Sequence, residues 1–297
     1  MEQEDIKTIL TKIRNYEIRI RKAVNSQLRG SFASVFKGSG LEFDDVRAYQ
    51  YGDDVRRIDW IVSAKGDETY IKVFKEEKEQ TVFFLLDVSG SQNIGQGKEN
   101  KLNLGKEICS VLALSAVKEA SEIGLICFSD QKEKYIKPDK GMKKAYEIML
   151  NLFKLQQISD KTNLSAFIHF ALNLIKRRSI VILVSDFIDT NYEEKMKAMA
   201  RKHDLIVIHL MDDKEVCLPK LGIVPIQDCE SNTVRWVNTS SSFFQRHMTE
   251  SFHKRQKALE NFCQKYQANY LLVKTNEDFV PKLVKLFKVR NRASKGV

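Results

Sequence analysis

From residue 81 onward the chain alternates between short apolar runs and longer segments with helical periodicity. Three runs are continuous in apolar residues over the length of a strand: VFFLLDV (82–88), SIVILVSDF (179–187) and LIVIHLMD (205–212). The segment KLNLGKEICSVLALSAVKEAS (101–121) is long enough for a helix. Buried strands that alternate with helices are typical of a mostly parallel sheet covered on both faces. The sequence therefore predicts an α/β, Rossmann-like fold in which helices flank a mostly parallel central sheet.

The segments outside this pattern predict an N-terminal extension and a hairpin. Apolar residues recur at helical spacing over residues 2–28, which indicates a helix with one apolar stripe. The stripe consists of Ile6, Leu10, Ile13, Ile20 and Val24. YIKVFK (70–75) alternates like an edge strand, and IQDCESNTVRWVNTS (226–240) is typical of a hairpin inserted before the last helices.

Composition argues against several classes of protein. The net charge is +10, but Lys and Arg are interleaved with Asp and Glu, as in KVFKEEKEQ (72–80). Nucleic-acid surfaces usually gather basic residues on one face, so a solvated basic surface is preferred over nucleic-acid binding. No apolar run reaches the ~18–20 residues of a membrane span, and the acidic start MEQEDIKTIL lacks a signal-peptide pattern. We therefore expect a cytoplasmic protein without a transmembrane segment, and its scattered cysteines as reduced thiols.

The stretch DVSGS places Asp87, Ser89 and Ser91 at alternate positions at the end of the first apolar run. Three interpretations are open: a helix cap, a nucleophile or a metal site. A cap needs only one of the three side chains. A nucleophilic serine needs a neighbouring base, and the GxSxG elbow is absent because Asn93 stands where glycine is required. The metal site is favoured, because alternate residues leaving a strand face the same side and all three supply oxygen for a hard cation such as Mg²⁺.

A second carboxylate lies at a comparable place in the chain. Asp186 ends the apolar run SIVILVSDF, much as Asp87 ends VFFLLD. In parallel α/β sheets, ligands bind at the carboxyl ends of the strands, where the strand order reverses. We therefore predict that Asp87 and Asp186 face one shared crevice.

The pattern D-x-S-x-S resembles the metal-ion-dependent adhesion site of von Willebrand factor A domains. This resemblance implies a further threonine from a following loop and an aspartate from a later strand end. Thr162, in SDKTNLSAF, and Asp186 stand at these places. The implied metal site is therefore Asp87, Ser89, Ser91, Thr162 and Asp186. By this resemblance the hydroxyls contact the ion, whereas the carboxylates act largely through water. The plainer alternatives are a helix N-cap for Thr162 and a cap or turn residue for Asp186.

The segment before the first strand resembles a particular family. Residues 39–80 contain the elements G-x-EF, R-x-Y, GDD-x-R-x-IDW and SA(K/R). They are similar to the family called domain of unknown function fifty-eight, in which such a segment precedes a von Willebrand A-like domain. The organisation that this implies is an N-terminal helix and signature segment (1–78) packed on a von Willebrand A-like domain (79–290), with a basic tail (291–297).

The signature stretch GDDVRRIDW has two interpretations. The residues singled out in it are Gly52, Asp53, Asp54, Arg56, Asp59 and Trp60. Asp53 and Asp59 are one candidate pair for a catalytic acid and base. We favour a hydrogen-bonded clasp that holds the N-terminal segment to the A domain, in which Gly52 permits a tight turn, Asp53 or Asp54 bonds backbone amides, and Ile58 and Trp60 anchor the loop. The clasp predicts that Asp59→Ala lowers stability rather than abolishing a turnover.

Members of the resembled family are often associated with MoxR-type AAA+ ATPases. The resemblance therefore implies a non-enzymatic adaptor in complex maturation or chaperone-like work. Its cofactor would be Mg²⁺, or Mn²⁺ or Ca²⁺, bound alone or only with a partner. The expected partner is a protein with an acidic residue, namely a MoxR-type ATPase or a membrane-associated A-domain protein. The sequence has no GxxxxGK[ST] motif, so ATP hydrolysis would come from the partner. The competing prediction is a metal-dependent hydrolase in the same crevice, with Asp186 or Asp189 as general base.

Overall fold

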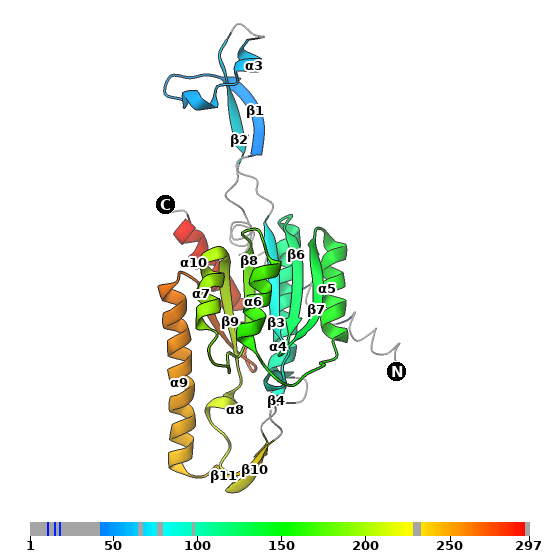
Figure 1. Ribbon diagram of the computed structural model, residues 1–297, viewed down its shortest axis with the longest axis vertical. Helices are drawn as coiled ribbons and strands as arrows, with labels where there is room; N and C mark the ends of the chain where they lie inside the picture. Colours follow the sequence, from blue (N-terminus) through cyan, green and yellow to red (C-terminus); the bar gives the residue numbers. More distant parts are fainter. Residues whose placement is uncertain are drawn as a thin grey trace.

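The computed structural model describes residues 42–64, 68–75, 80–96, 99–227 and 233–294, together with Thr11, Asn15 and Ile18. Its centre is a six-stranded sheet with the order β12-β9-β8-β3-β6-β7 (Figure 1). The strands are β3 (Thr81–Asp87), β6 (Glu122–Phe128), β7 (Lys132–Asp139), β8 (Ile180–Ser185), β9 (Asp204–Met211) and β12 (Asn269–Lys274). Neighbouring strands pair in parallel except β6 and β7, which are antiparallel. The predicted α/β fold with a mostly parallel sheet is confirmed.

The strand order reverses between β3 and β8. The chain passes from β3 to β6 and β7 on one side, and then returns to β8, β9 and β12 on the other side. This is the doubly wound order, and its ligand crevice lies at the carboxyl ends of the strands at the reversal. Asp87 is the last residue of β3, and Asp186 is the first residue after β8. The two carboxylates thus flank the point where a ligand crevice is expected.

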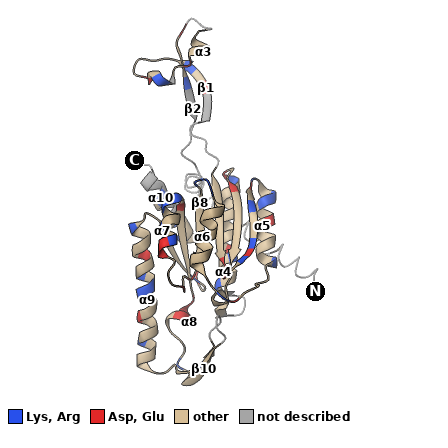
Figure 2. Ribbon diagram, in the orientation of Figure 1, with Lys and Arg blue, Asp and Glu red and all other residues tan. Residues whose placement is uncertain are grey.

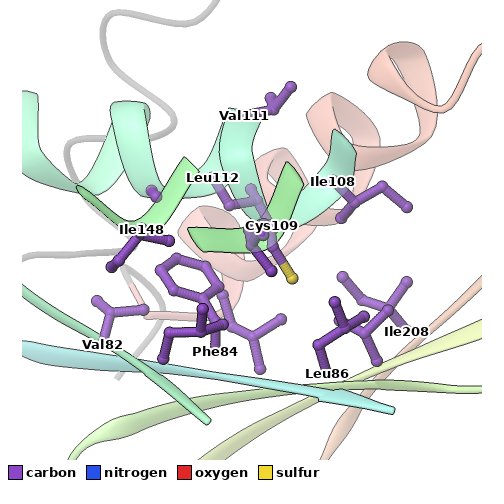
Figure 3. Packing of buried hydrophobic residues seen from close by; sticks show 14 of the residues in the cluster. Val82, Phe84, Leu86, Ile108, Cys109, Val111, Leu112, Ile148 and Ile208 are labelled. Atoms are coloured by element: carbon purple, nitrogen blue, oxygen red, sulfur yellow. The ribbon is translucent and has the colours of Figure 1, made fainter. Parts of the chain in front are cut away.

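Helices cover both faces of the sheet, and each face has its own apolar core. The helices are α4 (Lys101–Lys118), α5 (Met142–Lys154), α6 (Leu164–Leu174), α7 (Glu193–Lys202), α9 (Ser242–Lys265) and α10 (Val280–Ser294). One core is formed with α4, α5 and α10, and the other with α6, α7 and α9. Side chains alternate along β3, so Val82, Phe84 and Leu86 join the first core and Phe83 and Leu85 the second. Figure 3 shows the first three on the side of the sheet that faces α4.

The hairpin expected before α9 is confirmed. It pairs β10 (Ile223–Gln227) with β11 (Val234–Asn238) in antiparallel register, and it begins slightly before the predicted range. On α7 and α9, basic and acidic residues lie side by side, as the interleaved sequence indicated (Figure 2). No helix in the described part of the chain has both the length and the apolar content of a membrane span.

Two predicted segments fall largely outside the described residues. Of the helix expected over residues 2–28, only Thr11, Asn15 and Ile18 are described, and all three are helical and exposed. The apolar stripe of that helix is therefore not tested. The basic tail is described only as far as Ser294, which ends α10.

The residues before β3 form a small unit around the signature stretch. β1 (Glu42–Ala48) pairs antiparallel with β2 (Tyr70–Lys75), which confirms the strand expected at 70–75. The connection holds two short helices, η2 (Val55–Arg57) and α3 (Trp60–Ser63), and both contact β2. The packing of this unit on the main domain stays a prediction.

Aspartates hold the GDDVRRIDW stretch together. Arg47 donates to both carboxylate oxygens of Asp53 at 2.9 and 2.7 Å, and Asp53 also accepts a backbone amide at 2.8 Å. Asp54 accepts the amide of Arg56 at 3.0 Å and so begins η2. Gly52 has a φ of 105°, which a residue without Cβ adopts at little cost. These contacts all lie within the small unit and favour a structural role for Asp53 over a catalytic one, whereas the hold of this stretch on the A domain stays a prediction.

Asp59 belongs to the same hydrogen-bonded unit, whereas the tryptophan beside it does not anchor that unit. Asp59 is the N-cap of α3 and accepts the amides of Ile61 and Val62 at 3.0 and 3.2 Å. The bond from Val62 is the main cause that holds the pKa of Asp59 below its usual value, and Lys72 adds a weaker attraction. The expected anchoring by Trp60 is wrong, because this residue is 70% exposed. The single turn of α3 buries none of its own residues.

Asp59→Ala is expected to loosen this unit, because it removes the acceptor for two amides of α3 and the partner of Lys72. Hydrogen exchange of the β1 and β2 amides will report the change, since local opening of the unit exposes them. Asp59→Asn retains a capping oxygen and is the matched control, with exchange close to that of the wild type. Unaltered exchange in Asp59→Ala would contradict the clasp.

Candidate functional site

Asp87, Ser89 and Ser91 converge within a tight turn at the end of β3. The strand ends at Asp87, and the short helix η3 (Gly90–Asn93) follows directly after Ser89. The hydroxyl oxygens of Ser89 and Ser91 lie 3.2 Å apart. The sequence predicted this convergence from the alternation of an extended strand, and that reason is wrong. The hydroxyls meet because the chain leaves the sheet and turns, which folds Ser91 back toward Ser89.

Asp87 is completely buried and accepts four hydrogen bonds. Its Oδ1 accepts the amide and the hydroxyl of Ser89 at 3.0 and 2.7 Å. Its Oδ2 accepts the hydroxyl of Ser185 at 2.6 Å and the side-chain amide of Gln92 at 3.3 Å. Burial, and then the charge of Asp186, raises the pKa of Asp87 to about 7 in spite of these bonds. A cation nearby would favour the charged form of this carboxyl.

Thr162 lies on a loop that is tied to both neighbouring turns. The amide of Gly90 donates to the carbonyl of Asp160 at 2.8 Å, which joins the loop to the DVSGS turn. The amide of Leu164 donates to Asp189 Oδ2 at 2.7 Å, which joins the loop to the segment after β8. The topology therefore brings Thr162 to the same edge of the sheet as the two serines.

The helix-cap alternative for Thr162 is wrong. The N-cap of α6 is Asn163, whose side chain accepts a backbone amide at 2.9 Å. Thr162 is half-buried and lines an open hollow together with Asn163 and Asp189. Because Thr162 lines this open hollow, a ligand can reach it from outside the protein.

Asp186 is bound by a buried lysine that the sequence did not suggest. Lys101, the first residue of α4, places Nζ 2.5 Å from Asp186 Oδ2 and also pairs with Glu215 of the short helix α8 (Asp213–Val216). The other oxygen of Asp186 accepts the amide of Ile188 at 3.2 Å, which is the turn role considered as an alternative. Burial lowers the pKa of Lys101, but attraction to Asp186 and Glu215 outweighs it and the pKa lies above the usual value.

No local pattern marks Lys101 and Glu215 as members of the site. Lys101 is 85 residues from Asp186 and 114 residues from Glu215 in the chain. It follows an asparagine N-cap and begins a helix, where a lysine usually faces water.

The donor set fits a hard divalent cation. Two oxygens that bind one Mg²⁺ at about 2.0–2.1 Å in octahedral geometry lie about 3 Å apart. The hydroxyls of Ser89 and Ser91, at 3.2 Å, are close to that separation. Within the described ranges, no group of three or more His, Cys, Asp and Glu side chains is arranged to hold a metal. This finding concerns those four residue types only, so it does not bear on serine and threonine hydroxyls. An ion at this place would therefore be held directly by the serine hydroxyls, and Asp87 and Asp186 would act on it from the second layer of residues.

The same contacts weaken the catalytic alternatives. Ser89 is fully buried, so it is poorly placed to attack a substrate. Of the two bases considered for a hydrolase, Asp186 is engaged by Lys101 and Ile188. Asp189 accepts two backbone amides, each at 2.7 Å. Asp186 is buried, and its bonds direct both oxygens at protein donors, whereas Asp189 lines the open hollow beside Thr162 with both oxygens holding loop amides.

The chain is similar to one protein family over most of its length. The family model described as "Protein of unknown function DUF58" matches residues 45–258. An uncharacterized protein of Mycobacterium bovis is 24% identical over 226 residues, which cover 75% of this chain and 71% of that protein.

Two solved structures are also similar to the chain. One is the conserved hypothetical protein BatB from Bacteroides thetaiotaomicron, with a TM-score of 0.45 and 15% identity over 72% of this chain and 99% of that chain. The other is the von Willebrand A domain of SpRpn10, with a TM-score of 0.36 and 10% identity over 70% of this chain and 94% of that chain.

Proposed function

Because this chain belongs to the DUF58 family of proteins of unknown function, and because hydroxyls and carboxylates meet where its sheet reverses order, we propose that it is a non-enzymatic interaction adaptor. It binds a divalent cation, most simply Mg²⁺, at the candidate site, and through the ion it binds a carboxylate of a partner protein. The observation that carries this proposal is the pair of hydroxyls 3.2 Å apart beside a fully buried aspartate.

The contacts of Asp87 and Asp186 support a role of the ion in binding a partner rather than in catalysis. Asp87 accepts four hydrogen bonds, and Asp186 is engaged by Lys101 and by the amide of Ile188. Ser89, Ser91 and Thr162 would then be the direct ligands, and each is neutral. A Mg²⁺ ion commonly keeps waters on its remaining positions. Because neutral ligands leave the positive charge of the ion largely unbalanced, an incoming Asp or Glu is attracted to it.

We further propose that the partner is a MoxR-type AAA+ ATPase. The resemblance of the signature stretch to the family supports this choice, as does the lack of a phosphate-binding GxxxxGK[ST] motif in the chain. Adaptor and ATPase would then divide the work, one recognising a target and the other hydrolysing ATP. Binding of the cognate ATPase should be lost in EDTA and in Asp87→Ala. Equal capture by wild type and Asp87→Ala would remove the ion from the mechanism.

Ser91→Ala is expected to weaken Mg²⁺ binding by about tenfold or more, at least as much as the loss of an outer partner of a metal site. Isothermal titration of the purified chain with MgCl₂ measures this directly. Ser115→Ala is the matched control, because Ser115 is a buried serine of α4 whose hydroxyl bonds only its own helix at 2.9 Å. Wild-type protein that takes up no Mg²⁺ or Mn²⁺ would refute the proposed site.

A further inference from the structure

The placement of Lys101 is unfavourable on general grounds. Its side chain is completely buried, although a buried ammonium group loses its hydration. It is also the first residue of α4, where the helix dipole disfavours a positive charge. Buried ion pairs of this kind are weak evidence for a stabilising role. The position of Lys101 is therefore better explained by its effect on the neighbouring candidate ion site than by a contribution to stability.

Lys101 engages a carboxylate that could otherwise turn to the ion. Lys101 Nζ donates a hydrogen bond to Asp186 Oδ2 at 2.5 Å, and the amide of Ile188 donates to Asp186 Oδ1 at 3.2 Å. The lysine is itself held by Glu215, whose second oxygen accepts the amide of Asp212 at 3.1 Å in a capping box. Both oxygens of Asp186 are therefore directed at protein donors.

The helix that carries Glu215 is fastened to the turn that carries the serines. Lys214 of α8 donates to the carbonyl of Gly95 at 2.9 Å, just beyond η3. Lys101, Asp186 and Glu215 thus form a rigid bridge from α4 across the end of β8 to α8. The bridge fixes where the Asp186 carboxylate lies relative to Ser89 and Ser91.

We propose that Lys101 is a positioning residue that holds Asp186 out of direct contact with the bound ion and so keeps the ion attractive to a carboxylate of the partner. This inference rests on the proposed function of the site. If Asp186 became a direct ligand, its negative charge would offset part of the charge of the ion. The ion would then be held more tightly, and it would bind an external carboxylate less well.

A charge-matched double variant separates this role from a change in net charge. In the wild type, Asp186, Glu215 and Lys101 together carry one negative charge, and in Lys101→Met/Glu215→Gln the remaining Asp186 also carries one. The glutamine side chain introduced by Glu215→Gln can still accept the amide of Asp212, because glutamine serves in a capping box as glutamate does. The variant therefore releases Asp186 without altering the total charge beside the site.

The probe is Mn²⁺, measured by isothermal titration and by water-proton relaxation per bound ion. The double variant is expected to bind Mn²⁺ about tenfold more tightly, the scale on which outer partners tune metal sites. Its relaxation per ion should fall, because a carboxylate oxygen replaces a bound water. Acetate should lower the relaxation of the wild-type complex more than that of the variant. Unchanged affinity and unchanged relaxation in the variant would overturn the role of Lys101.

Two further measurements keep the outcomes distinct. Wild-type protein that binds no Mn²⁺ refutes the proposed function and the role of Lys101 with it, whereas a wild type that binds Mn²⁺ beside an unchanged double variant refutes only the latter. Circular dichroism shows whether the double variant folds. If it does not, the relaxation per ion in Glu215→Gln decides, because the affinity of that variant also responds to the lost negative charge. Lys101 then still pairs with Asp186, so the relaxation per ion should stay unchanged, and a fall would overturn the inference.

Discussion

Asp87→Asn is expected to stabilise the metal-free protein at pH 8 by about 2 kcal/mol, although it removes a carboxylate from the candidate site. Burial, and then the charge of Asp186, raises the pKa of Asp87 to about 7 in the folded protein, against 3.8 for an ordinary aspartate. At pH 8 that difference corresponds to a penalty of roughly 4 kcal/mol for the buried carboxylate. The weaker hydrogen bonds of a neutral amide offset part of the gain.

The surroundings of Asp87 can accept an amide. In Asp87→Asn, the remaining side-chain oxygen would still accept the two donors of Ser89. The new NH₂ group would donate to the hydroxyl of Ser185, which now donates to this position, and to Gln92, whose Oε1 is buried without a hydrogen-bond partner among the described residues. Rotation of the Gln92 side-chain amide brings that oxygen to the place where its nitrogen now bonds Asp87.

The stability gain of Asp87→Asn depends on pH in a defined direction. Well below pH 3.8, Asp87 is protonated in both the folded and the unfolded wild type, and the penalty disappears. As the pH rises from about 4 to about 7, the unfolded chain releases this proton while the folded protein keeps it. The contribution of Asp87 to wild-type stability therefore falls over this range and is constant above it. The advantage of the variant grows over the same range.

Urea unfolding in EDTA at pH 5 and pH 8 measures this advantage, with Asp139→Asn as the control for an exposed carboxylate at a strand end. Added Mg²⁺ should then stabilise the wild type but not Asp87→Asn, because only a protein that binds the ion gains from it. If Asp87→Asn is less stable than the wild type at pH 8 in EDTA, the buried charge of Asp87 does not destabilise the folded protein.

Phe84→Ala is expected to lower the free energy of unfolding by about 3–5 kcal/mol, the usual cost of removing a buried aromatic ring. Phe84 is completely buried in the middle of β3, and its ring packs between the sheet and α4, near Ile148 and Leu112 (Figure 3). A loss of this size is a large part of the ~5–15 kcal/mol that holds a typical domain.

Chemical unfolding of Phe84→Ala, with Phe170→Ala as the control, measures this cost. Phe170 lies on α6 and is 37% exposed, so its truncation should cost much less. A loss below about 1 kcal/mol in Phe84→Ala would mean that the core between β3 and α4 collapses around the missing ring.

The main features of the fold were predictable because they depend on local patterns. Continuous apolar runs such as that of β8 are buried on both faces, and the residues between them have helical periodicity. The antiparallel edge strand β7 was visible only as KYIKP, and its pairing depends on the neighbour that the sheet offers. In the N-terminal unit, backbone-amide bonding by Asp53 and Asp54 was predictable, but the capping role of Asp59 and the exposure of Trp60 were not, because they depend on where α3 begins and on what packs against it.

The candidate site was predictable in part. The positions of Asp87 and Asp186 followed from the rule that strand ends meet at a point of reversal. The convergence of Ser89 and Ser91 was expected for the wrong reason, because a turn rather than a strand brings them together. The raised pKa of Asp87 follows from complete burial, which no local sequence pattern measures.

The sequence by itself determined the order of the elements, the apolar faces of the strands and the oxygen-rich turn after β3. Each of these depends on residues close together in the chain, where periodicity and turn chemistry operate. Only the tertiary structure decided that Lys101 reaches Asp186 and Glu215, 85 and 114 residues away. Such contacts form because sheet order and helix packing bring distant strand ends and helix starts to one edge. The charge beside the site is therefore a property of the packed molecule, not of the D-x-S-x-S motif.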